Sequence, residues 1–322
     1  GRRNILELAV IVLKQVAILV IFVAMGILAV KAGKITVDVS KNLSNLLLYF
    51  IGPFLIIDSL AVPYDPAKTT GFVVTLGLSA VIHLLFILGS KLLLKKGTSD
   101  NLPVERYAAI FCNTGYIGIP LIQGIFGKGA VFYLVAFMIA FNIFSWTYGM
   151  WILQKEVRLT ARQMLLNPGN LASLIGLALY FSRITLPDMV ASVVSSIAST
   201  NTFLSLFAVG VVCSQIDFRS LLQSKRVLYV ALCRLVLLPL AVFALVIWWI
   251  PLVLPETGSV IASVLTVASM TPCAMSLSFM CQISGRDPVY GSQILALSTV
   301  LCVITVPVPN KNRITRIHKT LS

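Results

Sequence analysis

The sequence contains few charged residues, and this scarcity excludes an ordinary soluble fold. Only 11% of its 322 residues are Asp, Glu, Lys or Arg, whereas 58% are hydrophobic and the mean hydropathy is +0.96. A soluble domain has about 25% charged and about 45–50% apolar residues. Polar side chains are therefore too few to cover a water-facing surface, and the composition predicts a polytopic membrane protein.

Residue types that build catalytic or metal sites are also scarce. The chain has 11 Asp and Glu, two histidines (His83 and His318) and six scattered cysteines. Catalysis inside a membrane by metal or acid–base chemistry needs clustered carboxylates or a placed His/Asp pair, and no apolar segment of this chain carries two carboxylates. The cysteines form no CxxC or Cys/His pair and are expected to be small apolar fillers. The sequence therefore predicts no enzyme, no metal and no cofactor.

Ten apolar segments repeat along the chain, and each is long enough to cross a bilayer as a helix, which takes about 20 residues. Seven contain no charged side chain, and three contain a single ionisable one, which is Lys14, Asp58 or Arg234. The segments are 8–30, 42–64, 69–90, 107–127, 129–154, 163–182, 189–216, 227–255, 257–285 and 288–310. The sequence therefore predicts an all-α fold of ten transmembrane helices.

The net charge of +14 comes mainly from loops rather than from a nucleic-acid-binding surface. With ten spans, the loops after the odd-numbered spans carry 14 Lys and Arg, whereas the opposite loops carry three. Positive residues in short loops mark the cytoplasmic face. The two ends of the chain add six positive residues to the other side without reversing this bias. Both termini are expected to be extracytoplasmic in a plasma or inner membrane, with the lipid bilayer as a partner and no nucleic acid.

A polar connection between the fifth and sixth spans divides the chain into two halves. The halves are predicted at 1–154 and 169–310, with a cytoplasmic connecting loop at 155–168 and a basic tail at 311–322. Each half has five spans, an odd number, so the second half enters the membrane with the opposite orientation. Inverted five-helix repeats are a common plan of secondary transporters, whose substrate lies between the repeats near the midplane.

The fourth span of each half contains a proline near its middle. In the first half it is Pro120, within "CNTGYIGIP", and in the second half it is Pro272, within "ASMTPCAMS". A proline frees the carbonyl four residues earlier, which is that of Tyr116 or Ala268 here. Unpaired backbone groups are tolerated at membrane depth only inside protein or beside a wet cavity. Because matching interruptions point to a transport site, we predict that the fourth and ninth spans are broken, interior helices.

A helix that begins again after a break presents free N–H groups and about half a positive charge, which together bind anions. Asn113 and Thr114 add side-chain donors at the first break, and Thr271 and Ser276 add them at the second. These features predict a carboxylate site that needs no buried lysine. Proline and glycine are also common in membrane helices whose neighbours accommodate a kink, so a purely structural kink is the alternative.

Four stretches of the sequence resemble the auxin efflux carrier family. They are "FCNTGYIGIPLIQGIFG", "LSNLLLYFIGPFLIIDSL", "LLNPGNLASLIGLAL" and "CRLVLLPLA". The first is similar to the family signature Asn-x-Gly-hydrophobic-x-Gly-x-Pro on the fourth helix, and the resemblance extends from about Ile5 to Pro307. It implies a scaffold of spans 1, 2, 6 and 7, and a transport bundle whose fourth and ninth helices cross at proline breaks.

The resemblance also implies transport of small organic anions. Plant members carry auxin, and bacterial members, whose malate and malonate permease-like branch this chain resembles, carry malate, malonate or related carboxylates. Plant members form dimers, and the sequence leaves open whether this chain forms a homodimer.

Residue by residue, the resemblance names candidates for the substrate site. Asn113 and Pro120 match the substrate-facing residues of the first crossing helix, and Pro272 matches the second proline. Ile51 and Pro53 would line the scaffold wall. Including the small and polar residues around both breaks, the predicted substrate-binding set is Asn113, Thr114, Gly115, Pro120, Thr271, Pro272, Cys273, Ser276, Ile51 and Pro53. Unlike plant members, the sequence has no asparagine in 257–285.

Four further side chains inside predicted spans are candidates for polar or coupling roles, because an ionisable group in a bilayer is costly and is by default a functional candidate. They are His83, Asn142, Lys14 and Arg234. For Lys14 and Arg234 the alternative is snorkelling to the membrane surface, and for Arg234 also pairing with a helix end. For His83 the alternative is a packed, neutral imidazole.

These features together predict a secondary transporter of small organic anions across the plasma membrane. It would work by alternating access, with the substrate held where the fourth and ninth spans cross. A transporter-like receptor that binds an organic anion without moving it is the alternative. The sequence leaves open which anion is bound, the direction of transport and any coupling to protons or sodium.

Overall fold

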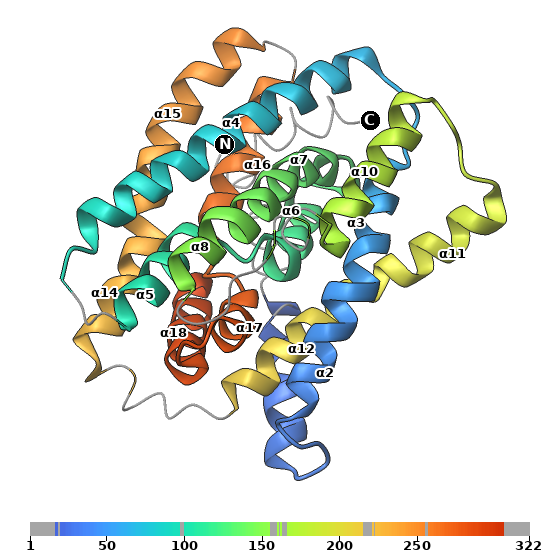
Figure 1. Cartoon of the computed structure of the whole chain (residues 1–322). Coiled ribbons are helices and arrows are strands. Elements are labelled where there is room, and N and C mark those ends of the chain that lie inside the picture. Colours follow the sequence, from blue (N-terminus) through green and yellow to red (C-terminus); the bar gives the residue numbers. More distant parts are fainter. Residues whose placement is uncertain are drawn as a thin grey trace, which may run out of the picture.

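The structure is a computed structural model that describes residues 17–18, 20–96, 100–154, 160, 162, 166–214, 221, 223–254 and 257–305. These residues form helices joined by short loops (Figure 1). Within the described ranges, the β-type pairing consists of one isolated antiparallel bridge between Cys112 and Cys273. The prediction of an all-α fold is therefore confirmed for this part of the chain, whereas Lys14 and the basic tail lie outside it.

Among the described residues, five helices are long and apolar enough to cross a membrane. Four of them are continuous runs that contain more than one labelled element, and three include a π-helical turn (η). Their elements are α2 (Val39–Leu46), η1 (Leu47–Ile51) and α3 (Gly52–Leu60); α4 (Pro66–Leu93); α7 (Lys128–Phe144), η3 (Ser145–Gly149) and α8 (Met150–Leu153); α11 (Asp188–Ser199) and α12 (Asn201–Cys213); and α14 (Lys225–Leu232), η4 (Cys233–Leu237) and α15 (Leu238–Val253).

Shorter helices complete the described fold. They are Val20–Lys31, α5 (Asn101–Ile110), η2 (Thr114–Gly118) with α6 (Ile119–Phe126), α10 (Pro168–Phe181), α16 (Gly258–Ser269), α17 (Ser276–Ile283) and α18 (Pro288–Thr305). Helices long enough to span a bilayer, together with these shorter apolar ones, are consistent with a polytopic membrane protein. The count of ten spans stays a prediction.

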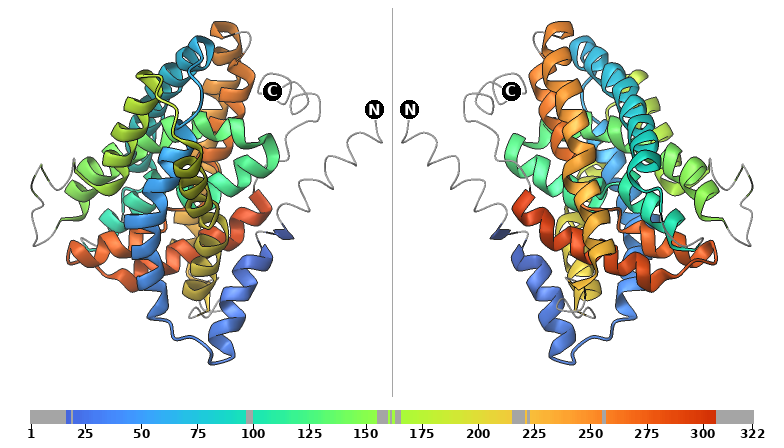
Figure 2. Two further views of the ribbon diagram at one scale, coloured as in Figure 1. Left: turned by 90° about the vertical axis from the view of Figure 1, so that its right-hand side faces the viewer. Right: turned by 90° about the vertical axis from the view of Figure 1, so that its left-hand side faces the viewer.

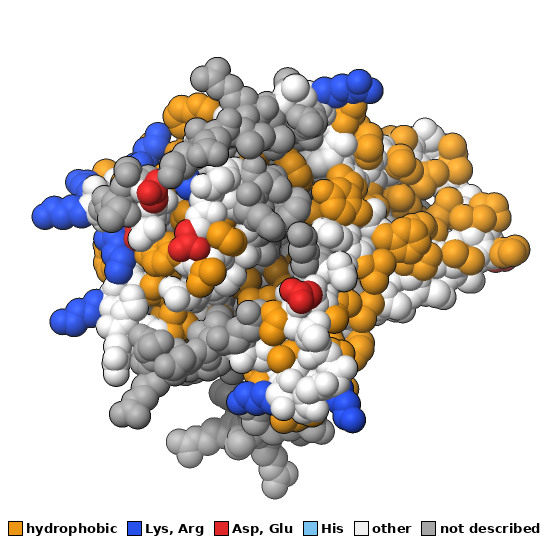
Figure 3. Space-filling model, turned by 60° about the horizontal axis from the view of Figure 1, so that its bottom comes forward, with side chains coloured by type: hydrophobic (Ala, Val, Ile, Leu, Met, Phe, Trp, Pro, Cys, Tyr) orange, Lys and Arg blue, Asp and Glu red, His pale blue; other side chains and the backbone are white. Residues whose placement is uncertain are grey.

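The outer surface exposes apolar side chains along single helix faces. On α4, Leu84, Leu88 and Leu92 are 50%, 57% and 66% exposed, and their spacing of four residues puts them on one face. Figure 3 shows extensive apolar surface on one side of the molecule, while Lys and Arg side chains lie around its margins. A soluble monomer rarely exposes contiguous apolar surface of this kind, so these faces suit contact with lipid.

The helices pack as two groups. In the first helix group, α3 contacts α10 and α11, and α2 contacts α12 (Figure 2). In the second helix group, α4 contacts α5 and α7, α6 contacts α7, α15 contacts α16, and α18 contacts both α14 and α17. The groups meet where α3 and α10 contact α7 and where α12 contacts η2. This boundary positions the candidate site.

Two glycines allow the helix Val20–Lys31 to join the first helix group. A Cβ at Gly26 would lie 2.2 Å from the Phe207 carbonyl oxygen, and one at Gly210 would lie 2.0 Å from that of Val23. Any larger residue would therefore push the two backbones apart, so close approach of these helices requires glycine at both positions.

The first helix interruption lies earlier in the chain than the proline predicts. Backbone leaves the helical conformation at residues 111–113, hereafter the first interruption, whereas Pro120 is the second residue of α6. The preceding π turn, η2, accommodates Pro120 inside a continuous helix, and the freed Tyr116 carbonyl accepts a 3.1 Å hydrogen bond from Ser205 Oγ. The prediction that Pro120 itself breaks the helix was wrong.

The second interruption, residues 270–275, does contain its predicted proline, Pro272. The Ala268 carbonyl, which Pro272 leaves without its usual helical partner, accepts a 2.8 Å hydrogen bond from Thr271 Oγ1. Side chains thus satisfy the freed carbonyl at each proline, as the cost of burying an unpaired carbonyl requires.

Candidate functional site

The two interruptions are hydrogen-bonded to each other at the centre of the molecule. The Asn113 N–H donates to the Pro272 carbonyl, and the Ala274 N–H donates to the Phe111 carbonyl, both at 2.8 Å. Cys112 and Cys273 lie opposite each other between these two bonds. Each interruption thereby satisfies backbone groups of the other, which allows non-helical chain to exist inside an apolar protein.

Asn113 connects the first interruption to the helix that follows it. Its side-chain oxygen accepts a hydrogen bond from the Tyr116 N–H at 3.3 Å and so caps η2. The residue is 2% exposed, and its Nδ2 has no hydrogen-bond partner within the described part of the chain. A buried amide donor is rarely left unpaired in a folded protein, so this group is available to a bound molecule.

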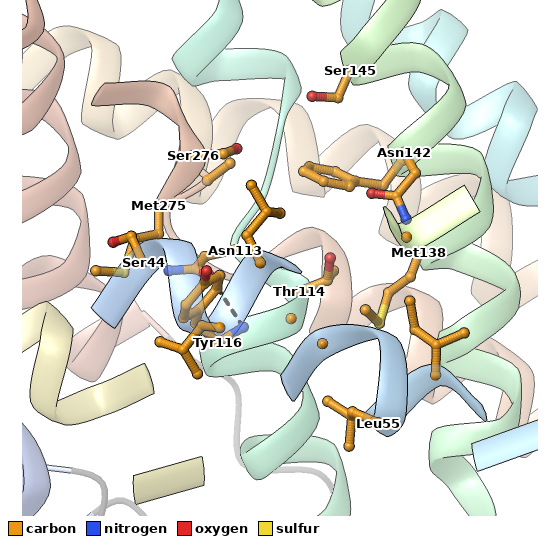
Figure 4. Close-up of a pocket in the computed structure, with 18 of the residues that line it drawn as sticks. Ser44, Leu55, Asn113, Thr114, Tyr116, Met138, Asn142, Ser145, Met275 and Ser276 are labelled. Atoms are coloured by element: carbon orange, nitrogen blue, oxygen red, sulfur yellow. Dashed lines mark hydrogen bonds between the residues drawn. The ribbon is translucent and has the colours of Figure 1, made fainter. Parts of the chain in front are cut away.

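A cavity of about 110 Å³, hereafter the central pocket, lies beside Asn113. Thr114 and Ser276, the first residues of η2 and α17, both line it, so two helix N-termini begin at its wall. Figure 4 shows side chains from several elements around this space, with Asn113 near its centre. The further polar side chains that line it are Ser44, Asn45, Tyr116, Asn142, Ser145 and Asn201.

The pocket lining is uncharged. Among the described residues that line it there is no Asp, Glu, Lys, Arg or His. Apolar side chains form the rest of the wall, among them Leu48, Met138, Trp146 and Met275. Within the described ranges, no group of three His, Cys, Asp or Glu side chains is placed to hold a metal ion. The site can therefore offer N–H and O–H donors, helix N-termini and apolar contact.

The structure brings together some of the predicted substrate-binding residues but not all of them. Asn113, Thr114, Gly115, Ser276 and Pro53 line the central pocket, as does Asn142, which the sequence marks as a polar candidate. The remaining predicted residues do not line it; these are Ile51, Pro120, Thr271, Pro272 and Cys273.

Local geometry explains why these residues lie elsewhere. Ile51 is 4% exposed and packs in the apolar core, and Pro120 lies in α6, beyond η2. The Thr271 hydroxyl caps α16, and Cys273 is fully buried in the bridge between the interruptions.

Asn201 is a pocket residue that sequence reasoning missed. It is 4% exposed at the start of α12, and its Nδ2 donates to the Gly115 carbonyl at 3.2 Å. An asparagine in the middle of the apolar segment 189–216 was the available signal. Asn201 links the first helix group to the first turn after the first interruption.

The two described ionisable candidates are both buried away from the pocket lining. His83 is fully buried; its Nδ1 lies 2.7 Å from the Ser79 carbonyl, and the Phe144 ring stacks on it at 5.4 Å. This is the environment of a packed imidazole. Arg234 is also fully buried and donates to carbonyls at helix ends. The helix-end alternative for Arg234 is confirmed, and snorkelling is wrong.

A second cavity of about 310 Å³ also has Leu55 in its wall. Leu55 lines both cavities, and the adjacent residues Asn201 and Thr202 each line one of them. The polar residues of the second cavity are Asp58, Ser59, Gln123, Lys128, Ser195, Ser199 and Thr202. The two cavities are therefore neighbours that share Leu55 in their walls.

The fold and the pocket place the chain in the class of multi-pass membrane proteins with an internal cavity. Residues 11–161 and 153–309 match the family described as "Membrane transport protein", and together they cover most of the chain. The chain belongs to this family, which includes the auxin efflux carriers. No curated protein matches it.

Proposed function

We propose that the chain is a secondary transporter of small organic anions, in which ten helices form two inverted five-helix repeats. The anion would bind in the central pocket, beside the crossing of the fourth and ninth helices. The observation that carries the proposal is the unpaired Nδ2 of buried Asn113, which lies beside two helix N-termini in that pocket.

The pocket chemistry favours a carboxylate. The N-terminal ends of η2 and α17 each contribute about half a positive charge at the pocket wall. Asn113 Nδ2 adds an unpaired donor, and a carboxylate oxygen is a strong acceptor for it. A cation would find no carboxylate among the described lining residues. The apolar wall beside Met138 and Met275 would contact the carbon skeleton of an acid such as malonate, malate or an auxin-like compound.

The position of the pocket favours transport over binding alone. It lies where two helix groups meet, and a relative movement of these groups would expose it to the two membrane faces in turn. Substrate sites of inverted-repeat transporters lie at such boundaries. With the predicted orientation, both termini would be outside and the protein would act in the plasma or inner membrane.

Flux into proteoliposomes tests this proposal. Radiolabelled malonate, malate and indole-3-acetate would be supplied to wild type, to Asn113→Ala and to Thr75→Ala. Thr75 is a matched control, because its buried hydroxyl bonds within α4 and does not line the pocket. Saturable flux of one acid, lost only in Asn113→Ala, supports transport through this pocket. Saturable binding without flux would show a receptor, and flux insensitive to Asn113→Ala would move the site elsewhere.

A further inference from the structure

Arg234 is a fully buried cation that contacts both broken helices. It lies in η4, in the first third of the apolar run from α14 to α15. Its Nη1 donates to the Ala109 carbonyl at 3.0 Å, and its Nη2 donates to the Ser269 carbonyl. Its Nε donates to the Thr271 carbonyl at 3.1 Å. One guanidinium therefore joins the C-terminal end of α5 to that of α16.

These partners are helix ends rather than carboxylates. The last carbonyls of an α-helix have no partner within the helix, and together they carry about half a negative charge. Two such ends amount to about one negative charge, which a single guanidinium balances. Within the described part of the chain, Arg234 forms no ion pair with Asp or Glu. Its planar fork of donors suits several carbonyls at once in a way that a lysine cannot.

The interruptions therefore have two electrostatically different sides. On one side, the C-terminal ends of α5 and α16 converge on Arg234. On the other side, the N-terminal ends of η2 and α17 line the central pocket. Without Arg234, two uncompensated negative helix ends would lie close behind the positive ends and weaken their attraction for an anion.

We infer that Arg234 is a positioning residue for the anion site: it holds the two helix interruptions together and supplies the positive charge that the pocket lining lacks. This inference rests on the proposed function. It assigns the counter-charge of the bound anion to a residue that does not touch it. It also accounts for a pocket whose described lining is uncharged yet suited to a carboxylate.

Two substitutions separate the charge of Arg234 from its shape. Arg234→Lys keeps the charge but loses the fork, whereas Arg234→Gln loses both. We expect Arg234→Gln to raise the KM for the transported acid by about tenfold or more, which is within the range of about 5–150-fold that is typical of coupling between sites. Arg234→Lys keeps the charge and should raise the KM by no more than about threefold. Equal KM values for the two variants, or no change in either, would overturn the inference.

Arg106 provides the matched control. It also caps a helix end, since its Nε and Nη2 donate to the Leu94 carbonyl at 3.2 and 3.0 Å, but it does not line the pocket. Arg106→Gln therefore removes the same kind of interaction elsewhere in the second helix group. We expect it to lower thermal stability without changing KM. A KM change like that of Arg234→Gln would mean that any lost helix cap produces the effect.

A measurement that does not depend on transport activity tests the role of Arg234 separately from the proposed transport function. Cys112 and Cys273 are fully buried between the interruptions, so their alkylation by N-ethylmaleimide reports whether this region opens. The other four cysteines, Cys213, Cys233, Cys281 and Cys302, would be replaced by Ala. We expect Arg234→Gln to speed alkylation about tenfold or more, and Arg106→Gln to leave it unchanged. Absent wild-type flux would contradict transport alone, whereas unchanged alkylation in folded Arg234→Gln would contradict the positioning role of Arg234.

Discussion

The backbone N–H of Asn113 donates a 2.8 Å hydrogen bond to the carbonyl of Pro272, and this bond joins two segments that are far apart in the sequence. The side chain of Asn113 does not take part in it. Its oxygen caps η2, and its Nδ2 is left for a ligand. Backbone therefore holds the interruptions together while the side chain is free to bind, and the two roles can be separated by mutation.

Asn113→Asp tests the side-chain role at constant size. The aspartate can still cap η2, and a carboxylate at a helix N-terminus is itself favourable, so we expect the folded protein to persist. The new negative charge would repel an anion in the pocket, and flux of the transported acid should fall by about tenfold or more. Proteoliposome flux beside a thermal melt checks this. Undiminished flux in a folded Asn113→Asp variant would show that no anion approaches this position.

The wall formed by Leu55 should separate the two faces of the membrane. Ser44 lines the central pocket, and Ser59 lines the second cavity. Cysteines placed at these two positions should react with a membrane-impermeant thiol reagent from opposite sides, because the six native cysteines are buried. Adding Leu55→Ala, which leaves a gap in the wall, should let the cysteine at position 44 react from both sides.

The side of the membrane from which each cysteine reacts tests whether the two cavities belong to one path. Reaction of both cysteines from one side would mean that the cavities are not two ends of one path. The variant Leu60→Ala serves as the control, because Leu60 is fully buried in the same helix α3 but lines neither cavity. It should lower stability without changing which side labels each cysteine.

An ion pair between buried Glu105 and partly exposed Arg226 should stabilise the second helix group. Glu105 is 1% exposed; Arg226 donates to both of its carboxylate oxygens, and the Tyr290 hydroxyl donates to one of them at 2.9 Å. Because the Arg226 side chain is 35% exposed, water screens this pair, and removing the arginine should cost about 1–3 kcal/mol, less than for a fully buried pair. We expect Arg226→Ala to lower the free energy of unfolding by about this amount, and Tyr290→Phe by about 1 kcal/mol.

A double-mutant cycle measures the coupling in this pair. Glu105→Ala combined with Arg226→Ala should be less destabilising than the sum of the single variants, because no unpaired charge remains. Additive single effects in detergent unfolding experiments would show that the two side chains act independently.

Close packing at Gly210 should be sensitive to a single methyl group. A Cβ there would lie 2.0 Å from the Val23 carbonyl, so Gly210→Ala must separate α12 from the helix Val20–Lys31. We expect a loss of about 1–3 kcal/mol in the free energy of unfolding. Gly77 on α4 is the matched control, since a Cβ there meets nothing within 4 Å. Gly77→Ala should be neutral or stabilising by up to about 1 kcal/mol, and equal losses in both variants would refute the packing argument.

Composition and hydropathy were enough to predict the fold class, because a chain with so little charge can be covered only by lipid. The place of the first break was not predictable from Pro120 alone. A π turn can absorb a proline, and whether it does depends on a donor from another helix, here Ser205, which lies far away in the sequence.

The residues of the candidate site also divide into those that the sequence could predict and those that it could not. Asn113 lies in the first interruption and Ser276 directly follows the second, so both could be found from the sequence. Asn201 and Ser145 reach the pocket only through helix packing. The partners of Arg234 are backbone carbonyls, and every residue type has one. The amino-acid sequence therefore does not identify these partners. Pairing with a helix end could therefore be stated as an alternative, but which ends it would join could not.

The burial of Arg234 also has a consequence for the response to membrane voltage. Helix ends balance its local potential, but they are dipoles and carry no net charge, so the helices around it keep one full positive charge. In the proposed cycle, a singly charged anion bound in the pocket would make the helices around Arg234 and their cargo electrically neutral together. Without cargo, the same helices would return with a charge of about +1. Moving one charge through the membrane field costs or releases about 2.3 kcal/mol per 100 mV. For a singly charged cargo, the voltage would therefore govern the return of the empty carrier rather than the passage of the cargo.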